Sequence, residues 1–350
     1  MKKFLSVLVI CYAILCGSVY GAGNGSLKLI MAGDALLHAS VYNDAKQENG
    51  SYDFSKMLTA LEIAKKYDLA FYNQETILGG TKLGLSTYPA FNSPQEFGDN
   101  ILSLGFNLVS LANNHTLDRG EKAVLSSLEF WRGKNALTAG SYGSFNERNQ
   151  VQILKKNGIT YALLAYTYGT NGIPLPKGKE YLVNVYTKEM LRKDIAAVRE
   201  KVDFLMVSMH WGIEYDFAPS AEQKQYAKLL SELGVDLVIG THPHVVQPAE
   251  WIGDTLVYYS LGNLISGQRG TNKRIGMLGS VEITKVKDGK VKLSNPRAEL
   301  IYTYYNAQFK NFKLMWFSEL NNTILQNYKS IYKEYMNIIT QGKSDIKIGL

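Results

Sequence analysis

From Leu27 onward, short apolar runs alternate with longer amphipathic stretches, and this alternation constrains the fold more than any other feature. The runs end in glycine or polar residues, as buried strands do, and the stretches between them carry apolar side chains at helical spacing. Predicted strands include Leu27–Ala32, Leu69–Tyr72 and Asn107–Leu111, and predicted helices include Gly120–Arg132 and Ala221–Leu233. The pattern predicts an α/β protein with stacked β-sheets flanked by helices.

Several local predictions can be compared with a structure. Asn157-Gly158 lies between two apolar runs and predicts a hairpin turn. Apolar spacing predicts a helix over Phe54–Lys66, and later runs predict antiparallel strands at Val245–Trp251, Thr255–Ser260 and Met277–Lys287. Beyond Tyr305 the pattern is helical, with Leu320–Ile339 the best candidate. The carboxyl-terminal extension is therefore expected to mix strands with a helix, and the irregular segments Ser86–Pro94 and Gly169–Lys179 are expected to line a cleft.

The amino end has the parts of a secretory signal. Lys2 and Lys3 precede the apolar run Phe4–Cys16, and small residues follow up to Gly21. The run is short for a segment that crosses a bilayer. We predict that residues 1–21 are a signal peptide and that the protein is exported to the periplasm or cell envelope. An uncleaved membrane anchor formed by residues 4–16 is the alternative.

Cysteine content and charge exclude several classes of protein. The two cysteines, Cys11 and Cys16, both lie in the predicted signal, so a disulfide scaffold, a zinc finger and a thiol catalyst are excluded in the body. The formal net charge of +7 is concentrated in residues 271–350, which hold 13 Lys/Arg and 6 Asp/Glu. This basic end could favour an acidic polymer or an anionic membrane surface, but a solvated basic face without a partner is the more common role of such a segment. No nucleic-acid motif accompanies it, so nucleic acid is not an expected partner.

Each of the five histidines follows closely after a predicted strand. They are His38, His115, His210, His242 and His244. In open α/β sheets, ligands bind outside the carboxyl ends of the strands. One lone histidine at such a position would be unremarkable, but five at one edge predict a functional site.

Carboxylate and amide side chains accompany these histidines. Asp34, Asn73, Glu75, Asn114, Asp118 and Glu214 all lie beside predicted strand ends. Borderline divalent metals prefer such a mixture of carboxylate, amide oxygen and imidazole. His242 and His244 would face the same side of an extended segment, so both could reach one cluster. With Asp34 or Glu75 as a bridging carboxylate, the set suits two metals about 3.5–4 Å apart.

The ordered motifs are similar to those of the capsule-synthesis CapA family of bacterial surface proteins. The resemblance covers about Ser26 to Arg269. It is carried by Gly33-Asp34 with His38, Asn73-Gln74-Glu75-Thr76, Tyr88-Pro89-Ala90-Phe91, Leu111-Ala112-Asn113-Asn114-His115 with Asp118, His210-Trp211-Gly212 with Glu214, Gly240-Thr241-His242-Pro243-His244, and Ser260-Leu261-Gly262-Asn263. The family is tied to poly-γ-glutamate capsules and itself resembles the calcineurin-like metallophosphatases.

The resemblance implies a metallophosphatase-like fold, two divalent metal ions (manganese, iron or zinc) and a role for each site residue. Asp34 and His244 would bind the first metal, Asn114, His210 and His242 the second, and Glu75 would take the bridging position. His115 would be the general acid. His38, Asn73, Asp118, Glu214 and Asn263 are candidate contacts to substrate or metal.

The resemblance also implies a domain organisation and a function. Residues 22–270 would form the CapA-like domain. Residues 271–350 lie outside the resemblance, and their sequence pattern predicts basic strands and a helix packed on the same domain. The expected function is metal-dependent phosphoester hydrolysis in capsule or cell-envelope polymer biosynthesis. The expected partners are the polymer, for example poly-γ-glutamate, or a phosphorylated intermediate, and a membrane-associated synthesis complex. Two alternatives remain: a non-catalytic polymer-binding or assembly component, and a metal-dependent amide hydrolase or transferase acting on the polymer.

Overall fold

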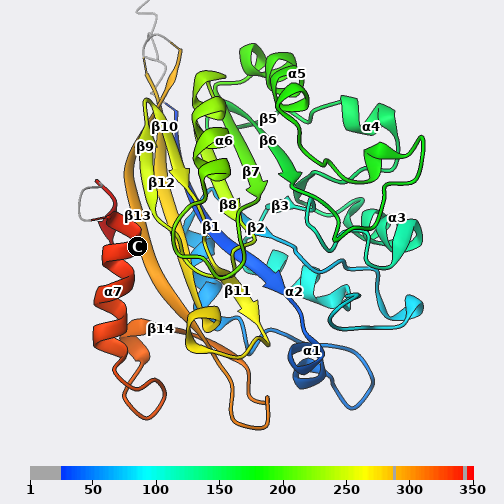
Figure 1. Ribbon diagram of the computed structural model, residues 1–350, viewed down its shortest axis with the longest axis vertical. Helices are drawn as coiled ribbons and strands as arrows, with labels where there is room; N and C mark the ends of the chain where they lie inside the picture. Colours follow the sequence, from blue (N-terminus) through cyan, green and yellow to red (C-terminus); the bar gives the residue numbers. More distant parts are fainter. Residues whose placement is uncertain (1–24, 287–288, 342–344) are drawn as a thin grey trace, which may run out of the picture.

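The computed structural model describes residues 25–286, 289–341 and 345–350, and it contains two β-sheets that pack face to face between outer helices (Figure 1). The predicted signal peptide, residues 1–21, lies outside the described residues. Within the described ranges, no helix has both the length and the apolar character needed to cross a membrane. The two packed sheets and their outer helices confirm the α/β prediction of stacked sheets flanked by helices.

The first sheet is built around β1 (Ser26–Leu36), the long central strand drawn in blue in Figure 1. On one side β1 pairs in parallel with β2 (Leu69–Asn73), followed by β3 (Leu108–Ser110) and β4 (Leu137–Ala139). On the other side the order is β12 (Ile275–Lys285), β13 (Val291–Tyr304) and β14 (Lys313–Trp316), all antiparallel. Two short strands, β11 (Asn263–Ser266) and β15 (Lys347–Ile348), pair with β1 and β13. The carboxyl-terminal segment thus completes the sheet that carries the amino-terminal strand.

The second sheet has the order β5 (Leu154–Lys156), β6 (Ile159–Thr167), β7 (Phe204–His210), β8 (Leu237–Thr241), β10 (Thr255–Tyr258) and β9 (Ala249–Ile252). From β6 to β10 the strands are parallel. Asn157 and Gly158 join β5 to β6 with positive φ angles of 49° and 82°, the conformation of a type I′ hairpin turn. The predicted hairpin is therefore confirmed.

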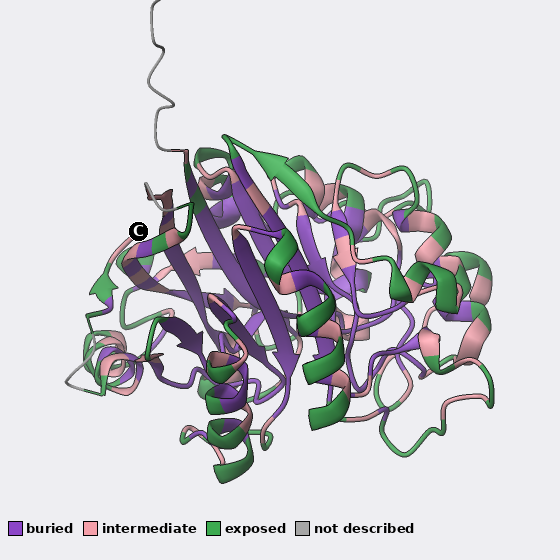
Figure 2. Cartoon of the chain, turned by 90° about the horizontal axis from the view of Figure 1, so that it is seen from above, coloured by how far each residue is buried: buried purple, intermediate pink, exposed green. Residues whose placement is uncertain are grey.

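Apolar side chains form three layers around these sheets. The central layer lies between the sheets and joins Met31 and Phe71 of the first to Leu163 and Met206 of the second. The helices α1 (Ala39–Ala45) and α2 (Glu96–Ser103) cover the outer face of the first sheet, and α5 (Lys188–Val198) and α6 (Ala221–Glu232) cover that of the second. Figure 2 shows the resulting gradient, with buried strands inside and exposed helix faces outside. The remaining helices are α3 (Gly120–Trp131), α4 (Phe145–Asn149) and α7 (Tyr328–Thr340).

Three local predictions need correction. The segment Phe54–Lys66 forms a 3₁₀ helix only over η1 (Thr59–Lys66), because Leu58, Leu61 and Ala64 are buried at the three-residue spacing of that helix. The run Val245–Trp251 becomes a strand only from Ala249, and β10 pairs in parallel with β8 as well as antiparallel with β9.

The carboxyl-terminal prediction is right for a helix and wrong for the segment before it. Residues 313–316 form strand β14, in which Leu314 is buried and Lys313 is exposed. That alternation has the period of two that marks a half-buried strand. The helix then begins at Tyr328, eight residues after its predicted start.

Candidate metal centre

The carboxyl ends of parallel strands from both sheets meet at one place. Asp34 lies near the end of β1, Asn73 ends β2 and His210 ends β7, while His242 and His244 directly follow β8. All five side chains are buried. The two sheets therefore bring carboxylate, amide and imidazole groups together at the edge where ligands bind in such folds.

Asp34 connects the two sheets. Its carboxylate accepts a hydrogen bond from Asn73 Nδ2 at 2.6 Å and another from the backbone N–H of His242 at 3.0 Å. The preceding Gly33 allows a close approach, because a Cβ atom there would lie 1.8 Å from the carbonyl oxygen of Gly262. The motif Gly33-Asp34 thus needs its glycine so that β1 can lie against the backbone of Gly262.

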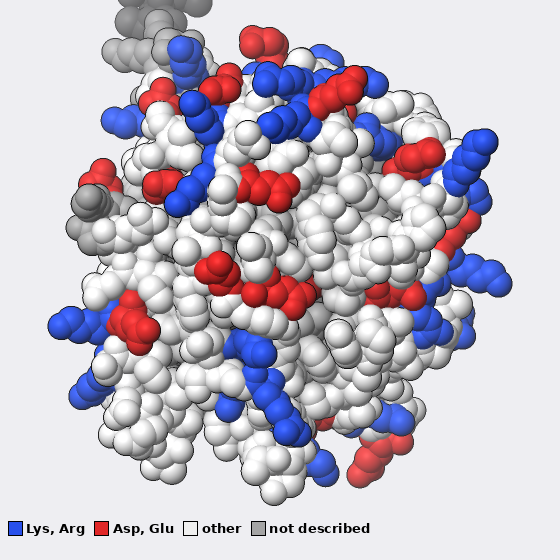
Figure 3. All heavy atoms as spheres, in the orientation of Figure 1, with Lys and Arg blue, Asp and Glu red and all other residues white. Residues whose placement is uncertain are grey.

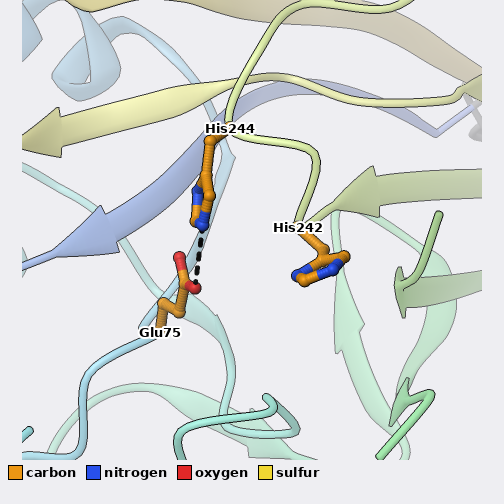
Figure 4. A group of neighbouring side chains, drawn as sticks. All are labelled: Glu75, His242 and His244. Carbon is orange, nitrogen blue, oxygen red and sulfur yellow. Dashed lines mark ion pairs between the residues drawn. The ribbon is translucent and has the colours of Figure 1, made fainter. Parts of the chain in front are cut away.

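Glu75 is the most unusual group in the site. It is fully buried, and neither of its carboxylate oxygens has a hydrogen-bond partner among the described residues. Its Oε1 lies 3.5 Å from His244 Nε2 (Figure 4). The same oxygen lies 4.0 Å from His210 Nε2. Burial, with the nearby Asp34 carboxylate, raises the pKa of Glu75 well above its ordinary range. A buried carboxylate without partners is costly, so a bound cation fits this position.

The histidine pair after β8 lies on a tight bend. His242 has a φ of 96° and His244 a φ of 59°, so the extended conformation expected for this segment is wrong. The two rings still converge, with centroids 5.9 Å apart. Glu75, His242 and His244 offer ligand atoms that all lie within 4.8 Å of one another, and His242 Nδ1 is buried without a partner. The bend brings both imidazoles to the carboxylate.

The pKa values of the buried histidines shift in different directions. Burial lowers the pKa of His210 and His242 well below the ordinary value, and the neighbouring imidazoles add to the effect. Burial also opposes the charged form of His244, but the carboxylates of Glu75 and Asp34 outweigh it and raise its pKa to about 9. Neutral imidazoles are the form that binds metal ions, and His244 must therefore release a proton when a cation enters.

Asn114 and His210 form a second group beside Glu75. Asn114 Oδ1 lies 2.9 Å from His210 Nε2, and His210 Nδ1 lies 3.0 Å from Thr241 Oγ1. The amide Nδ2 of Asn114 donates to Asn171 Oδ1 at 3.1 Å. An amide oxygen and an imidazole nitrogen thus face the cluster together.

His115 is held by a carboxylate. Its Nδ1 lies 2.7 Å from Asp118 Oδ2, which also accepts the backbone N–H of Phe91 at 2.7 Å. The Phe91 ring packs edge-on against His115 with centroids 4.7 Å apart. An imidazole oriented in this way can give or take a proton at its other nitrogen.

The other predicted contact residues have distinct surroundings. Asn73 holds Asp34, and Asn263 Oδ1 lies 3.0 Å from His244 Nδ1 and so orients that ring. The ring nitrogen of His38 interacts with the backbone of Leu36 and Gly267 rather than with the carboxylates, and burial lowers its pKa to about 4. Glu214 is exposed, and its charge contributes to the raised pKa values of Glu75 and His244.

Three exposed loop residues lie beside the cluster, and no role was assigned to any of them from the sequence. The Tyr168 ring lies 4.7 Å from His242, the Tyr215 ring lies 6.0 Å from His244, and Asn171 contacts both Asn114 and His115. Tyr168 and Asn171 lie on or next to the irregular segment Gly169–Lys179, so its composition was the signal that pointed to them. Acidic and basic side chains both occur near the middle of the face in Figure 3.

Sequence comparisons match this chain to a family model and to curated relatives. The family model described as bacterial capsule synthesis protein PGA_cap matches residues 28–268. The PGA biosynthesis protein CapA of Bacillus subtilis is 29% identical over 199 residues, which cover 55% of this chain and 50% of that protein. The capsule biosynthesis protein CapA of Bacillus anthracis is 28% identical over 174 residues, 49% of this chain and 42% of that protein. The chain thus spans about half the length of the curated relatives it matches.

One solved structure shares the fold at low sequence identity, and a second is similar to a lesser degree. A candidate 5′-nucleotidase from Staphylococcus aureus superimposes with a TM-score of 0.50 and 17% identity, covering 89% of this chain and 58% of that one. A calcineurin-like phosphoesterase from Bacillus subtilis has a TM-score of 0.45 and 14% identity, covering 90% of this chain and 99% of that one. At 17% identity, the similarity to the Staphylococcus aureus structure is evidence for the fold and not for the activity.

Proposed function

Because the chain belongs to the bacterial capsule synthesis protein PGA_cap family, we propose that it is an exported hydrolase of capsule or cell-envelope polymer production that cleaves phosphoesters with two divalent metal ions. One observation carries this proposal. Both oxygens of Glu75, Oδ1 of Asn73 and Nδ1 of His242 are buried at one site without hydrogen-bond partners among the described residues. Buried polar atoms are normally satisfied, so these atoms point to cations as their partners.

The surroundings of Glu75 support two ligand groups. Its Oε1 lies 3.5 Å from His244 Nε2 and 4.0 Å from His210 Nε2. We assign Asp34 and His244 to the first metal, Asn114, His210 and His242 to the second, and Glu75 to both. A mixture of carboxylate, amide and imidazole ligands suits manganese, iron or zinc.

The chain's own residues would divide the remaining work. Divalent ions held here would lower the pKa of water and polarise phosphoryl oxygens. His115 would give a proton to the leaving oxygen, and Asp118 would hold its imidazole in the required orientation. Asn263 and Asn73 would hold His244 and Asp34, as the outer partners of metal ligands commonly do.

The His115–Asp118 pair favours catalysis over a structural metal site. His115 belongs to neither ligand group, and its Nδ1 is engaged by Asp118 at 2.7 Å. A metal site that only stabilises the fold does not require an oriented proton donor beside it. The pair therefore supports a hydrolase rather than a polymer-binding component.

The test is phosphodiester hydrolysis by the wild type and His115→Ala in the presence of manganese. We expect the variant to keep its metal content and lose on the order of 10²–10⁴-fold in turnover, the usual contribution of a general acid. The loss should be larger on an unactivated phosphodiester than on a nitrophenyl ester, because the poorer leaving group depends more on the proton.

Two results would overturn the proposal. Absence of metal-dependent phosphodiester turnover in the wild type would return the protein to the polymer-binding alternative. Metal-dependent release of fragments from poly-γ-glutamate, with no phosphodiester turnover, would make it an amide hydrolase.

A further inference from the structure

A turn at the entrance places one amide against two of the predicted site residues. Asn171 follows β6, and its side chain reaches inward although the residue as a whole is exposed. Its Oδ1 accepts a hydrogen bond from Asn114 Nδ2 at 3.1 Å, and its Nδ2 lies 3.2 Å from His115 Nδ1. No motif in the sequence assigned this residue a role.

The turn that carries Asn171 has a defined conformation. Asn171 and Gly172 have positive φ angles of 51° and 76°, and the backbone N–H of Ile173 donates to the carbonyl of Thr170 at 2.9 Å. These values describe a type I′ turn, in which asparagine followed by glycine is strongly preferred. Thr170 Oγ1 adds a second hydrogen bond to the carbonyl of Ile173 at 2.5 Å. The amide of Asn171 is therefore presented from a fixed backbone.

The first contact sets the orientation of the Asn114 amide. The oxygen and nitrogen ends of an asparagine side chain have nearly the same shape, so only hydrogen bonds distinguish the two orientations. Asn171 Oδ1 can accept a hydrogen bond but cannot donate one, so it selects the Nδ2 end of Asn114. The Oδ1 end of Asn114 is then directed to His210 and the cluster, where a metal ligand must be an oxygen.

The second contact leaves a donor free. A ring nitrogen of a neutral imidazole carries either one hydrogen or one lone pair. Asp118 can only accept when ionised, so His115 Nδ1 carries the hydrogen and donates it over 2.7 Å. The 3.2 Å contact of Asn171 Nδ2 with this nitrogen is then an approach of two donors and not a hydrogen bond, so the Nδ2 group has no acceptor among the described residues. Its hydrogens remain available beside the imidazole that we propose as general acid.

We propose that Asn171 is a positioning and substrate-binding residue, whose oxygen fixes the Asn114 amide for metal binding and whose NH₂ group donates a hydrogen bond to an anionic oxygen of the bound phosphoester. The substrate half of this inference rests on the proposed function, whereas the positioning half requires only that the site binds metal. Tyr168, three residues before it and packed on His242, forms the adjoining wall of the entrance.

Two substitutions separate the two roles. Asn171→Asp keeps an oxygen that can accept from Asn114 but removes the donor. Asn171→Gly removes the whole amide and favours the left-handed backbone, so backbone strain cannot explain its effects. Asn311→Gly is the matched control, because Asn311 is also exposed with a positive φ, 59°, on the loop between β13 and β14. Manganese affinity is measured by equilibrium titration, and KM and kcat with a phosphodiester.

We expect Asn171→Gly to weaken manganese binding by at least about 10-fold, as the loss of an outer partner of a metal ligand does. Asn171→Asp should bind manganese at least as tightly as the wild type while its KM rises by at least about 10-fold, since a hydrogen bond to a charged oxygen is lost. Manganese affinity for Asn171→Gly equal to that of Asn311→Gly would overturn the positioning role. An unchanged KM for Asn171→Asp would overturn the substrate contact. Absence of turnover in the wild type would instead refute the proposed function, and the manganese titration would still decide the positioning role.

Discussion

Replacing Glu75 with glutamine should stabilise the metal-free protein and abolish its response to metal. Glu75 is fully buried, without hydrogen-bond partners among the described residues, and burial raises its pKa well above the usual range. In metal-free protein the folded chain therefore keeps a proton on Glu75 at pH values where the unfolded chain has lost it. Folded-state stability is then highest at or below the unfolded pKa, about 4.3, and falls as the pH rises towards the folded pKa.

The size of this effect follows from linkage. While the buried carboxyl stays protonated and its unfolded counterpart is ionised, each pH unit costs about 1.4 kcal/mol of unfolding free energy. An unfolding entropy of about 2.1 cal/mol/K per residue gives about 0.7 kcal/mol/K for this chain, so each such pH unit corresponds to about 2 °C in Tm. Glutamine keeps the shape of the side chain without a titratable group, so this part of the pH dependence should disappear.

Thermal melts of the wild type and Glu75→Gln, with chelator and with manganese, measure both effects from pH 6 to 8. Glu48→Gln is the matched control, because Glu48 is exposed and the substitution removes the same charge. We expect manganese to raise the Tm of the wild type and of the control but not that of Glu75→Gln. Equal pH slopes in all three metal-free proteins, or a full manganese shift in Glu75→Gln, would refute the reasoning.

Four further predictions follow from the same structure. Apparent manganese affinity should rise between pH 6 and 9, because His244, whose pKa is raised to about 9 by Glu75 and Asp34 against the effect of burial, must lose its proton before it binds metal, and a flat profile in pH-dependent titrations would contradict this. Asp118→Asn should keep the metal but lower kcat on the order of 10²-fold, because His115 loses its orienting carboxylate. Steady-state kinetics measure kcat, and an unchanged kcat would contradict this role. Leu256→Ala, in the core between the sheets, should cost about 2–5 kcal/mol in urea unfolding, and a cost below 1 kcal/mol would contradict the assigned packing. Amino-terminal sequencing should find the mature chain beginning near Ala22 in the envelope fraction, and full-length protein confined to the cytoplasm would refute export.

Periodicity in the sequence predicted the fold well wherever one period was clear. The parallel strands β1, β2 and β7 lie in continuous apolar runs, because both of their faces are covered, and such runs are easy to recognise. Short elements were harder to predict. β4 and β14 have only three and four residues, and their pairing depends on neighbours that lie far away in the sequence. Local pattern cannot reveal such long-range pairing.

The candidate site was predictable from residue type and position, but not from the local conformation assumed for it. His242 and His244 were expected to converge because of an extended segment, whereas they converge on a bend with positive φ angles. The role of Asp118 beside His115 and the contact of Asn171 with Asn114 depend on side-chain geometry that no spacing rule encodes. Motifs thus indicated which residues gather, and only the structure shows which atoms meet.

Metal stoichiometry measured together with phosphodiester turnover tests the central claim most directly. Purified chain would be titrated with manganese, and bound metal and hydrolysis would be followed in the same samples, for the wild type and for the double variant His242→Ala with His244→Ala. We predict up to two ions per chain, turnover that appears as they bind, and loss of both in the double variant. Equal metal content and equal turnover in the two proteins would contradict a metal centre built on Glu75, His242 and His244.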